Sequence, residues 1–159
     1  MAIIGIVAVD RNGAIGKDGT LPWHYSADLK FFKEQTRGNA CVMGYRTWLS
    51  VKKPLPGRLN VVLTRRAEVE LREAVVWLRD GQSVLSLYPY LNCDLFVIGG
   101  AQVFEMFRDR VDRWLVTEVP LAVEGADTFL PAGLLEPFRP RETRDLGDGL
   151  KVTFYERAR

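Results

Sequence analysis

A carboxylate near the start of a predicted helix is the chemically most suggestive feature of this sequence. Asp28 lies in the first turn of a helix predicted over about residues 27–36, where the helix dipole alone favours an acidic side chain. Residues three and four apart share a helix face, so Asp28 shares a mostly apolar face with Leu29 and Phe32. A carboxylate on such a face is costly without a hydrogen-bonding or charged partner. A ligand with an amidine-like pair of donors would be such a partner.

Trp23 and His24 precede this helix, in the segment Leu21-Pro22-Trp23-His24. An indole at the mouth of a helix can stack on a flat ligand or hold an ordered water through its N–H. His24 is the only histidine, and no paired group supports it as a general acid, so we interpret it as a surface residue. The sequence contains no Ser-His-Asp set, nucleophile elbow or metal-ligand spacing, which disfavours hydrolase and metal chemistry.

Three strand ends carry residues that suit phosphate groups. Gly99-Gly100 lies between a predicted strand and a predicted helix, and Met43-Gly44 repeats this arrangement. Glycine lets a backbone approach a ligand closely, and ligands of open α/β sheets bind at the carboxyl ends of strands. Thr64-Arg65-Arg66 follows a third strand, and a hydroxyl beside two guanidiniums suits a phosphate monoester. A plain glycine turn and an exposed basic turn are the alternative explanations.

The elements that must position these residues alternate between strands and helices. Strands are predicted at residues 2–9, 41–43, 60–64, 75–77, 94–98, 114–119 and 151–157, and helices at 27–36, 45–51, 82–91 and 101–107. Residues 13–22 form a glycine-rich loop without clear periodicity, and Ser26 is the predicted N-cap of the first helix. This order predicts a single α/β domain over residues 1–159, with a central, mostly parallel twisted sheet. An antiparallel C-terminal strand and about four flanking helices complete the prediction.

The composition is that of an ordinary globular domain. The chain has 159 residues, of which 47% are hydrophobic and 26% charged. A net charge of +2 is too small to indicate nucleic acid as a partner. Cys41 and Cys93 lie in apolar sequence, and we expect buried, reduced thiols rather than a disulfide or metal site. The apolar run at residues 2–9 has no basic leader and is too short to span a bilayer, which favours the cytoplasm.

Taken together, the order and spacing of several short motifs resemble the dihydrofolate reductase family over almost the whole chain. The matching stretches are Ile6-Val7-Ala8, Asn12-Gly13-Ala14-Ile15-Gly16, Leu21-Pro22-Trp23, Ala27-Asp28-Leu29 with Phe32-Lys33, Met43-Gly44, Thr47-Trp48, Leu55-Pro56-Gly57-Arg58, Ile98-Gly99-Gly100-Ala101-Gln102, and Glu124-Gly125 followed by Asp127-Thr128. The resemblance implies a cytoplasmic, monomeric enzyme of one-carbon metabolism that reduces 7,8-dihydrofolate to tetrahydrofolate with NADPH.

The same resemblance implies roles on the substrate side. Asp28 would bind the pterin amino group and the adjacent ring nitrogen, and would promote protonation next to the carbon that receives hydride. Thr117 would hydrogen-bond this carboxylate and bind the pterin through water, and Trp23 would hold the neighbouring water. Arg58 would fork onto the α-carboxylate of the glutamate tail. The substrate-binding residues so implied are Ile6, Ala8, Leu29, Phe32, Lys33, Val51 and Arg58.

For the cofactor, the resemblance places the glycine pair, Arg46 and Thr47 at the pyrophosphate, and Thr64 and Arg65 at the adenosine phosphate. Leu21, in a mobile loop, would close over the nicotinamide. The full set of implied cofactor contacts is Ala8, Ile15, Gly16, Leu21, Gly44, Arg46, Thr47, Leu63, Thr64, Arg65, Ile98, Gly99, Gly100, Ala101, Gln102 and Phe104. No metal is implied.

Four positions depart from the family pattern. Tyr45 stands where an arginine or lysine is usual, so one phosphate contact is lost and Arg46 carries more of it. Phe104 replaces a common tyrosine, Leu49 a frequent glutamate, and Ala126 is an insertion before Asp127. Two other functions are the alternatives: a related reductase of the riboflavin pathway, and a non-catalytic nucleotide- or folate-binding module. The segment from Leu21 to Asp28 disfavours the first, and the intact glycine pair disfavours the second.

Overall fold

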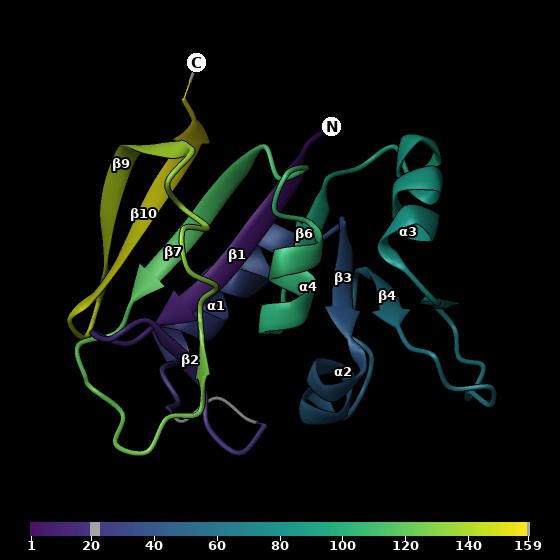
Figure 1. The fold of residues 1–159 in the computed structure, drawn as a ribbon, viewed down its shortest axis with the longest axis horizontal. Helices are drawn as coiled ribbons and strands as arrows, with labels where there is room; N and C mark the ends of the chain where they lie inside the picture. The colour runs from purple at the N-terminus through teal and green to yellow at the C-terminus, as the bar shows by residue number, and fades with distance from the viewer. Residues whose placement is uncertain (20–22, 159) are drawn as a thin grey trace.

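The computed structural model describes residues 1–19 and 23–158, and within them an eight-stranded sheet forms the centre of the molecule (Figure 1). Its strands run in the order β5-β4-β3-β6-β1-β7-β10-β9. Their bounds are β1 Ile3–Val9, β3 Ala40–Gly44, β4 Leu59–Leu63, β5 Val75–Leu78, β6 Leu95–Val97, β7 Arg113–Glu118, β9 Phe138–Gly147 and β10 Leu150–Arg157. Neighbours from β5 to β7 pair in parallel, whereas β10 is antiparallel to both β7 and β9. The predicted sheet is confirmed.

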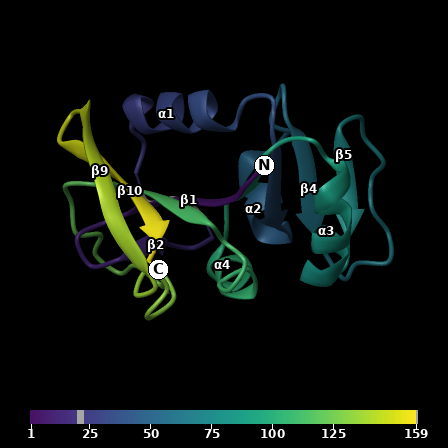
Figure 2. The same cartoon turned by 90° about the horizontal axis from the view of Figure 1, so that it is seen from above.

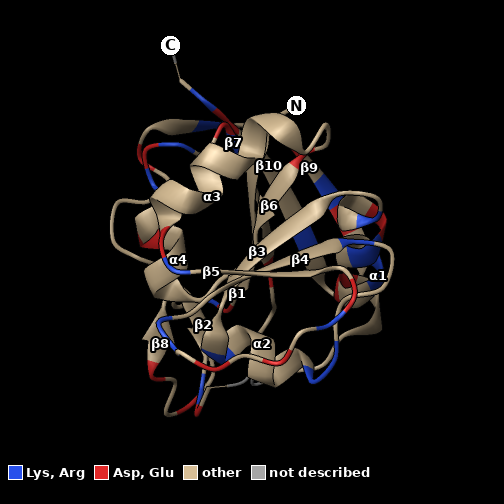
Figure 3. Ribbon diagram, turned by 90° about the vertical axis from the view of Figure 1, so that its right-hand side faces the viewer, with Lys and Arg blue, Asp and Glu red and all other residues tan. Residues whose placement is uncertain are grey.

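The central strands contain no charged residue because both of their faces are covered. In Figure 3, β1, β3, β4 and β6 are tan, and blue and red gather in the loops, on α1 and toward β9. Strands buried on both faces are continuously apolar rather than alternating. This explains why β1, β3 and β6 could be recognised in the sequence from short apolar runs alone.

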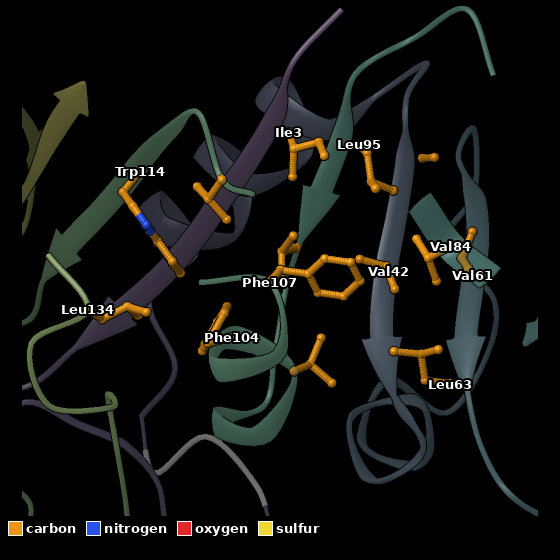
Figure 4. Packing of buried hydrophobic residues seen from close by; sticks show 14 of the residues in the cluster. Ile3, Val42, Val61, Leu63, Val84, Leu95, Phe104, Phe107, Trp114 and Leu134 are labelled. Carbon is orange, nitrogen blue, oxygen red and sulfur yellow. The ribbon is translucent and has the colours of Figure 1, made fainter. Parts of the chain in front are cut away.

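Helices lie on both faces of the sheet (Figure 2). The described residues form four α-helices, as predicted: α1 Ser26–Thr36, α2 Tyr45–Val51, α3 Gly81–Leu87 and α4 Ala101–Met106. On one face, Val84 of α3 and Phe104 of α4 pack with strand residues such as Val42, and Figure 4 shows this cluster. On the other face, Phe31 of α1 packs with Met43, and α2 lies against the same cluster. The helices thus hold the sheet between two apolar layers.

Several boundaries differ from the prediction. The helix predicted over 82–91 ends at Leu87 and continues as a 3₁₀ turn over Tyr88–Tyr90, which contains Pro89. Helix α1 begins at Ser26, and its N-cap is Tyr25, without a side-chain cap. The loop predicted at 13–22 contains a short strand, β2 Ala14–Gly16, which pairs with β8 Thr128–Phe129.

The sequence prediction missed β9 entirely. The strand has the sequence FRPRETRDLG, in which half of the positions are charged and one internal position is proline. It lies at the edge of the sheet, where proline is tolerated and polar side chains face water on both sides. Its pairing with β10 is reinforced by the ion pair between Arg141 and Glu156 at 2.5 Å.

Both cysteines are free thiols: Cys41 is buried and Cys93 is half-buried. Burial raises the pKa of the Cys41 thiol to about 12, so this group stays protonated and unreactive. No helix among the described residues has the length and apolar character needed to cross a membrane. Within the same residues, no group of three or more His, Cys, Asp or Glu side chains could hold a metal ion.

Candidate active site

The parallel strands bring most of the predicted ligand-binding residues to one edge of the sheet. Ala8 lies near the carboxyl end of β1, Gly44 ends β3, Thr64 follows β4, and Gly99 follows β6 by two residues. Because these strands pair side by side in the same direction, their carboxyl ends lie at the same edge. The sequence prediction of a site assembled from several separate strand ends is consistent with this arrangement.

Asp28 and Thr117 are in contact. The Thr117 hydroxyl on β7 donates a hydrogen bond to the half-buried Asp28 carboxylate. Thr117 is 2% exposed and lies opposite Ala8 in the β1–β7 register, so two central strands fix its position. Burial raises the pKa of Asp28, and the hydrogen bond from Thr117 opposes this rise without cancelling it. The site therefore contains a carboxylate whose proton affinity is above the ordinary value.

The helix face beside Asp28 is open to a ligand. Leu29 is 46% exposed and Phe32 is half-buried, whereas the neighbouring Phe31 is buried and packs edge-on against Phe154. Phe31 therefore attaches the helix to the sheet, and Leu29 and Phe32 remain available as an apolar wall. Of the other predicted wall residues, Ile6 is buried, and Ala8 and Val51 are half-buried.

Trp23 contributes a buried donor. Its Nε1 is buried and makes no hydrogen bond within the described part of the chain. Buried indole N–H groups usually have a partner. An N–H without a protein partner, close in sequence to Asp28, fits the water-holding role that the family resemblance implies for Trp23.

Arg58 is held in place before any ligand arrives. It is 7% exposed; its Nε donates to the Pro56 carbonyl at 2.9 Å, and its Nη1 donates to the Thr36 hydroxyl at 3.0 Å. The guanidinium also lies over the Phe32 ring, 5.9 Å from its centroid. Burial lowers the pKa of Arg58, but a guanidinium stays protonated in proteins. The Nη2 atom has no hydrogen bond within the described residues, which leaves donors for an anionic group. Thr36 was not predicted, because nothing in the sequence marks the last residue of a helix as an arginine partner.

The turns at Gly44 and at Gly99-Gly100 lie at the same edge of the sheet, where the parallel strands end. Gly44 and Gly99 are tightly packed, whereas Gly100 is open. The Gly44 N–H donates to the Gly99 carbonyl at 2.9 Å, and a Cβ on Gly44 would lie 3.2 Å from Val103. Gly99 has a φ of +121°, which favours glycine, and a Cβ there would lie 3.4 Å from the Phe104 ring. A Cβ on Gly100 would meet no atom within 4 Å. Gly100 thus offers backbone to the outside at the start of α4, as a closely approaching cofactor requires.

Basic residues surround these turns. Arg46 and Arg65 are exposed, and Thr47 and Thr64 are half-buried. The backbone N–H of Arg66 donates to the Thr64 hydroxyl at 3.1 Å.

Tyr45, at the position that departs from the family pattern, holds a second arginine. The Arg66 guanidinium lies over the Tyr45 ring, 5.0 Å from its centroid. The ring in turn packs against Trp77 at 6.5 Å. Arg66 belongs to the Thr64-Arg65-Arg66 motif that suits a phosphate monoester, although it is not among the cofactor contacts that the family resemblance implies.

Some of the predicted cofactor-binding residues have almost no solvent-exposed surface. Phe104 is 1% exposed and packs edge-to-face on Trp114 at 5.3 Å, so it supports the Gly99 turn from beneath. Its contact with the cofactor stays a prediction. Leu63 and Gly16 are also buried, whereas Ile15, Ile98 and Ala101 are half-buried and Gln102 and Lys33 are exposed. Leu21 lies outside the described residues.

Comparison with known proteins gives a consistent result. The sequence profile of the family described as dihydrofolate reductase matches residues 2–157. The dihydrofolate reductase of Haemophilus influenzae is 35% identical over 126 residues, covering 79% of this chain and 76% of that protein. A bifunctional dihydrofolate reductase-thymidylate synthase of Zea mays is 40% identical over 154 residues; the match covers 85% of this chain but 29% of that longer protein.

Solved structures agree with the sequence comparisons. A dihydrofolate reductase from Enterococcus faecalis, complexed with NADP(H) and RAB-propyl, superposes with a TM-score of 0.90 at 31% identity, and the superposition covers 98% of this chain and 96% of that one. The family profile and the solved structure match nearly the whole chain, and the two sequence relatives match 79% and 85% of it. The chain belongs to the dihydrofolate reductase family.

Proposed function

We propose that Asp28 is the catalytic carboxylate of the reaction that this family carries out. As a member of the family, the chain is an oxidoreductase that reduces 7,8-dihydrofolate to 5,6,7,8-tetrahydrofolate, with NADPH as cofactor. The observation that carries the proposal is the half-buried Asp28 carboxylate, hydrogen-bonded by Thr117 and bordered by the apolar side chains of Leu29 and Phe32.

Asp28 matches the donor pattern of a pterin. The amino group of the ring and its adjacent protonated nitrogen form a planar pair of donors, and a carboxylate accepts such a pair with two charge-assisted hydrogen bonds. Thr117 occupies one lone pair and thereby fixes the orientation of the carboxylate. Binding here draws electron density into the pterin and promotes proton uptake at the ring nitrogen next to the carbon that is reduced. The proton arrives through water, which the buried Trp23 N–H is placed to orient.

The remaining substrate residues divide between ring and tail. Leu29, Phe32, Ile6, Ala8 and Val51 form the apolar surroundings of the ring and of the group that follows it. The free N–H groups of Arg58 donate hydrogen bonds to the α-carboxylate of the glutamate tail, and the exposed Lys33 adds positive charge.

NADPH, when bound, supplies the hydride. The residues present fit this cofactor, because Gly100 exposes backbone without a side chain and Gly44 is confined by Val103. Gly44, Gly99, Gly100, Arg46 and Thr47 would hold the pyrophosphate, and Thr64 with Arg65 would hold the adenosine phosphate. The other residues of the proposed set are Ala8, Ile15, Gly16, Leu21, Leu63, Ile98, Ala101, Gln102 and Phe104.

The proposal is tested by adding 7,8-dihydrofolate to the purified protein with NADPH and following the loss of nicotinamide absorbance. We expect substrate-dependent oxidation, which a non-catalytic binding module would not show. No oxidation at any pH between mildly acidic and mildly alkaline conditions would contradict the assignment, even if both ligands bound.

We also propose that the chain acts as a monomeric, single domain in the cytoplasm. The most exposed large apolar side chains among the described residues, Leu71 at 87% and Tyr90 at 80%, are far apart in the sequence, and single exposed apolar residues are normal on a monomer. Light scattering coupled to size-exclusion chromatography tests this; a dimer at micromolar concentration would contradict it.

A further inference from the structure

We propose that Asn60 is a positioning residue for substrate recognition: its buried side-chain amide fixes the turn over residues 55–58 and so places Arg58 at the tail end of the substrate site. The proposal rests on the role proposed above for Arg58. It concerns a residue that touches no ligand and acts through the backbone of its neighbours.

Asn60 is the polar exception in its strand. Strand β4 has the sequence LNVVL, and Asn60 is 0% exposed within it. Burying an amide is costly unless its hydrogen-bonding groups are satisfied. Those of Asn60 are satisfied by backbone groups: Oδ1 accepts from the Leu55 N–H at 2.8 Å, and Nδ2 donates to the carbonyls of Leu55 at 3.1 Å and Arg58 at 3.1 Å. A longer contact at 3.4 Å joins Nδ2 to the Ala74 carbonyl, just before β5.

These bonds clamp the turn at both ends. One amide binds both backbone groups of Leu55, where the turn begins, and the carbonyl of Arg58, where it ends. Between them, Pro56 restricts one φ angle and Gly57 adopts a φ of +73°. The outer side of the turn is fixed separately, since the Gly38 N–H donates to the Gly57 carbonyl at 2.8 Å.

The clamp reaches Arg58 through the turn itself. Arg58 Nε donates to the carbonyl of Pro56, which lies between the two clamped residues. A shift of the turn therefore moves the guanidinium relative to Thr36, its partner on α1. Leu55 also packs in the apolar cluster beneath the substrate face. Loss of the Asn60 amide is expected to loosen the tail end of the site while leaving Asp28, which is on α1, in place.

Two substrates separate this role from a purely structural one. The first is 7,8-dihydrofolate, and the second is a 7,8-dihydropterin that lacks the aminobenzoylglutamate tail. For Asn60→Ala we expect the KM for dihydrofolate to rise about tenfold, the effect of losing roughly one well-formed charge-assisted hydrogen bond. The KM for the tail-less pterin, and turnover on it, should stay within about twofold of wild type, since Asp28 is undisturbed.

Val61→Ala is the matched control. Val61 is the next residue of β4 and is also 0% exposed, but its side chain packs in the cluster on the opposite face of the sheet. This variant should lower stability without changing the ratio of the two KM values. If Asn60→Ala is too unstable to purify, Asn60→Ser, assayed at low temperature, replaces it and should give the same selective rise.

Arg58→Ala completes the test. It should raise the KM for dihydrofolate selectively, and Asn60→Ala added to it should cause little further rise, because both act through one group. An equal rise for both substrates in Asn60→Ala, or fully additive effects in the double variant, would overturn the inference alone. An equal rise in Arg58→Ala would overturn the proposed role of Arg58 and the inference with it. Absence of any turnover by the wild type would instead contradict the proposed function.

Discussion

The two ends of the candidate site are built in different ways. At the substrate end, Asp28 is half-buried and Arg58 is buried, and each is hydrogen-bonded to a side chain from another element, Thr117 and Thr36 respectively. At the cofactor end, the arginines are exposed and the central feature is the backbone around Gly99 and Gly100. The fold therefore holds the charged side chains of the substrate end in place, whereas the cofactor end offers open backbone and exposed positive charge.

This difference has an energetic side. A buried charge costs folding free energy, and the fold accepts this cost where one carboxylate must be held in one orientation. Exposed arginines cost little, but each loses side-chain freedom when it binds a phosphate. We therefore expect single substitutions at the substrate end to have large effects on the reaction, and those at the cofactor end to have smaller effects on affinity.

The largest effect is expected for Asp28→Asn. An amide keeps the shape and can still accept from Thr117, but it presents no charge to the pterin. Turnover at neutral pH should fall by about a hundredfold or more, in the range of a lost acid–base group. Activity should recover in part as the pH falls, because a larger fraction of substrate arrives already protonated. Steady-state kinetics at a series of pH values measure the fall in turnover at neutral pH and its recovery in acid.

Glu34→Gln is the control for this variant. Glu34 is an exposed carboxylate on the same helix, so its replacement removes the same charge without touching the site. Its pH profile should match that of the wild type. Equal turnover of Asp28→Asn and wild type across the pH range would remove Asp28 from the mechanism and, with it, the contrast between the two ends.

A weaker effect is expected at the cofactor end for Gly100→Ala. The added Cβ meets no protein atom within 4 Å, and the φ of Gly100, −79°, lies outside the left-handed region that favours glycine. Stability should be unchanged, and the Kd for NADPH should rise about tenfold if the methyl group excludes one hydrogen-bonded phosphate oxygen. Fluorescence titration measures the Kd without turnover.

Gly99→Ala gives the opposite combination and serves as its comparison. Its φ of +121° and the Phe104 ring at 3.4 Å make any side chain strained, so this variant should lose stability first. If Gly100→Ala binds NADPH as tightly as the wild type, the pyrophosphate does not approach this turn.

The sequence predicted the two ends unequally well. Apolar runs and turn residues were enough to place the central strands, since these strands are buried on both faces. The prediction of β9 failed because an edge strand has no buried face to mark it. Asp28 could be singled out from helix spacing, but its contact with Thr117 depends on strand pairing far along the chain, and the resemblance alone suggested it.

At the cofactor end, residue type was a poor guide to exposure. The family resemblance implied a contact for Phe104, and its side chain on α4 packs in the core. Arg66 was part of the phosphate motif predicted from the sequence, but its stacking on the Tyr45 ring could not be predicted. Both outcomes are set by tertiary packing, which short-range patterns do not encode.

Arg66→Gln tests whether the stacked arginine contributes to cofactor choice. If its guanidinium contacts the adenosine phosphate, the Kd for NADPH should rise about three- to fivefold, as expected for one exposed ion pair. The Kd for NADH, which lacks this phosphate, should not change. Arg72→Gln, an exposed arginine near the amino end of β5, is the matched control. Parallel changes for both cofactors would assign Arg66 a general electrostatic effect.

The smallest effect concerns stability, and it returns to Asp28. Burial raises the pKa of this carboxyl above its ordinary value of 3.8, so the folded state disfavours the charged form. The stability of the wild type relative to Asp28→Asn is therefore greatest below pH 3.8, where the carboxyl is neutral. This relative stability of the wild type is lost as the pH rises through the raised pKa of Asp28. At neutral pH the inactive variant should thus unfold at a higher temperature than the wild type.

Thermal unfolding at several pH values measures this difference, which should narrow steadily as the pH is lowered. Glu34 is on the same helix but exposed, so Glu34→Gln should unfold at the same temperature as the wild type. If the unfolding temperature of Asp28→Asn stays above that of the wild type in acid, the amide packs better than the carboxyl for reasons unrelated to charge. If the rise in unfolding temperature vanishes in acid and turnover is lost at neutral pH, the charge of the half-buried Asp28 both lowers the stability of the fold and serves the reaction. The exposed arginines of the cofactor end do not combine these two effects.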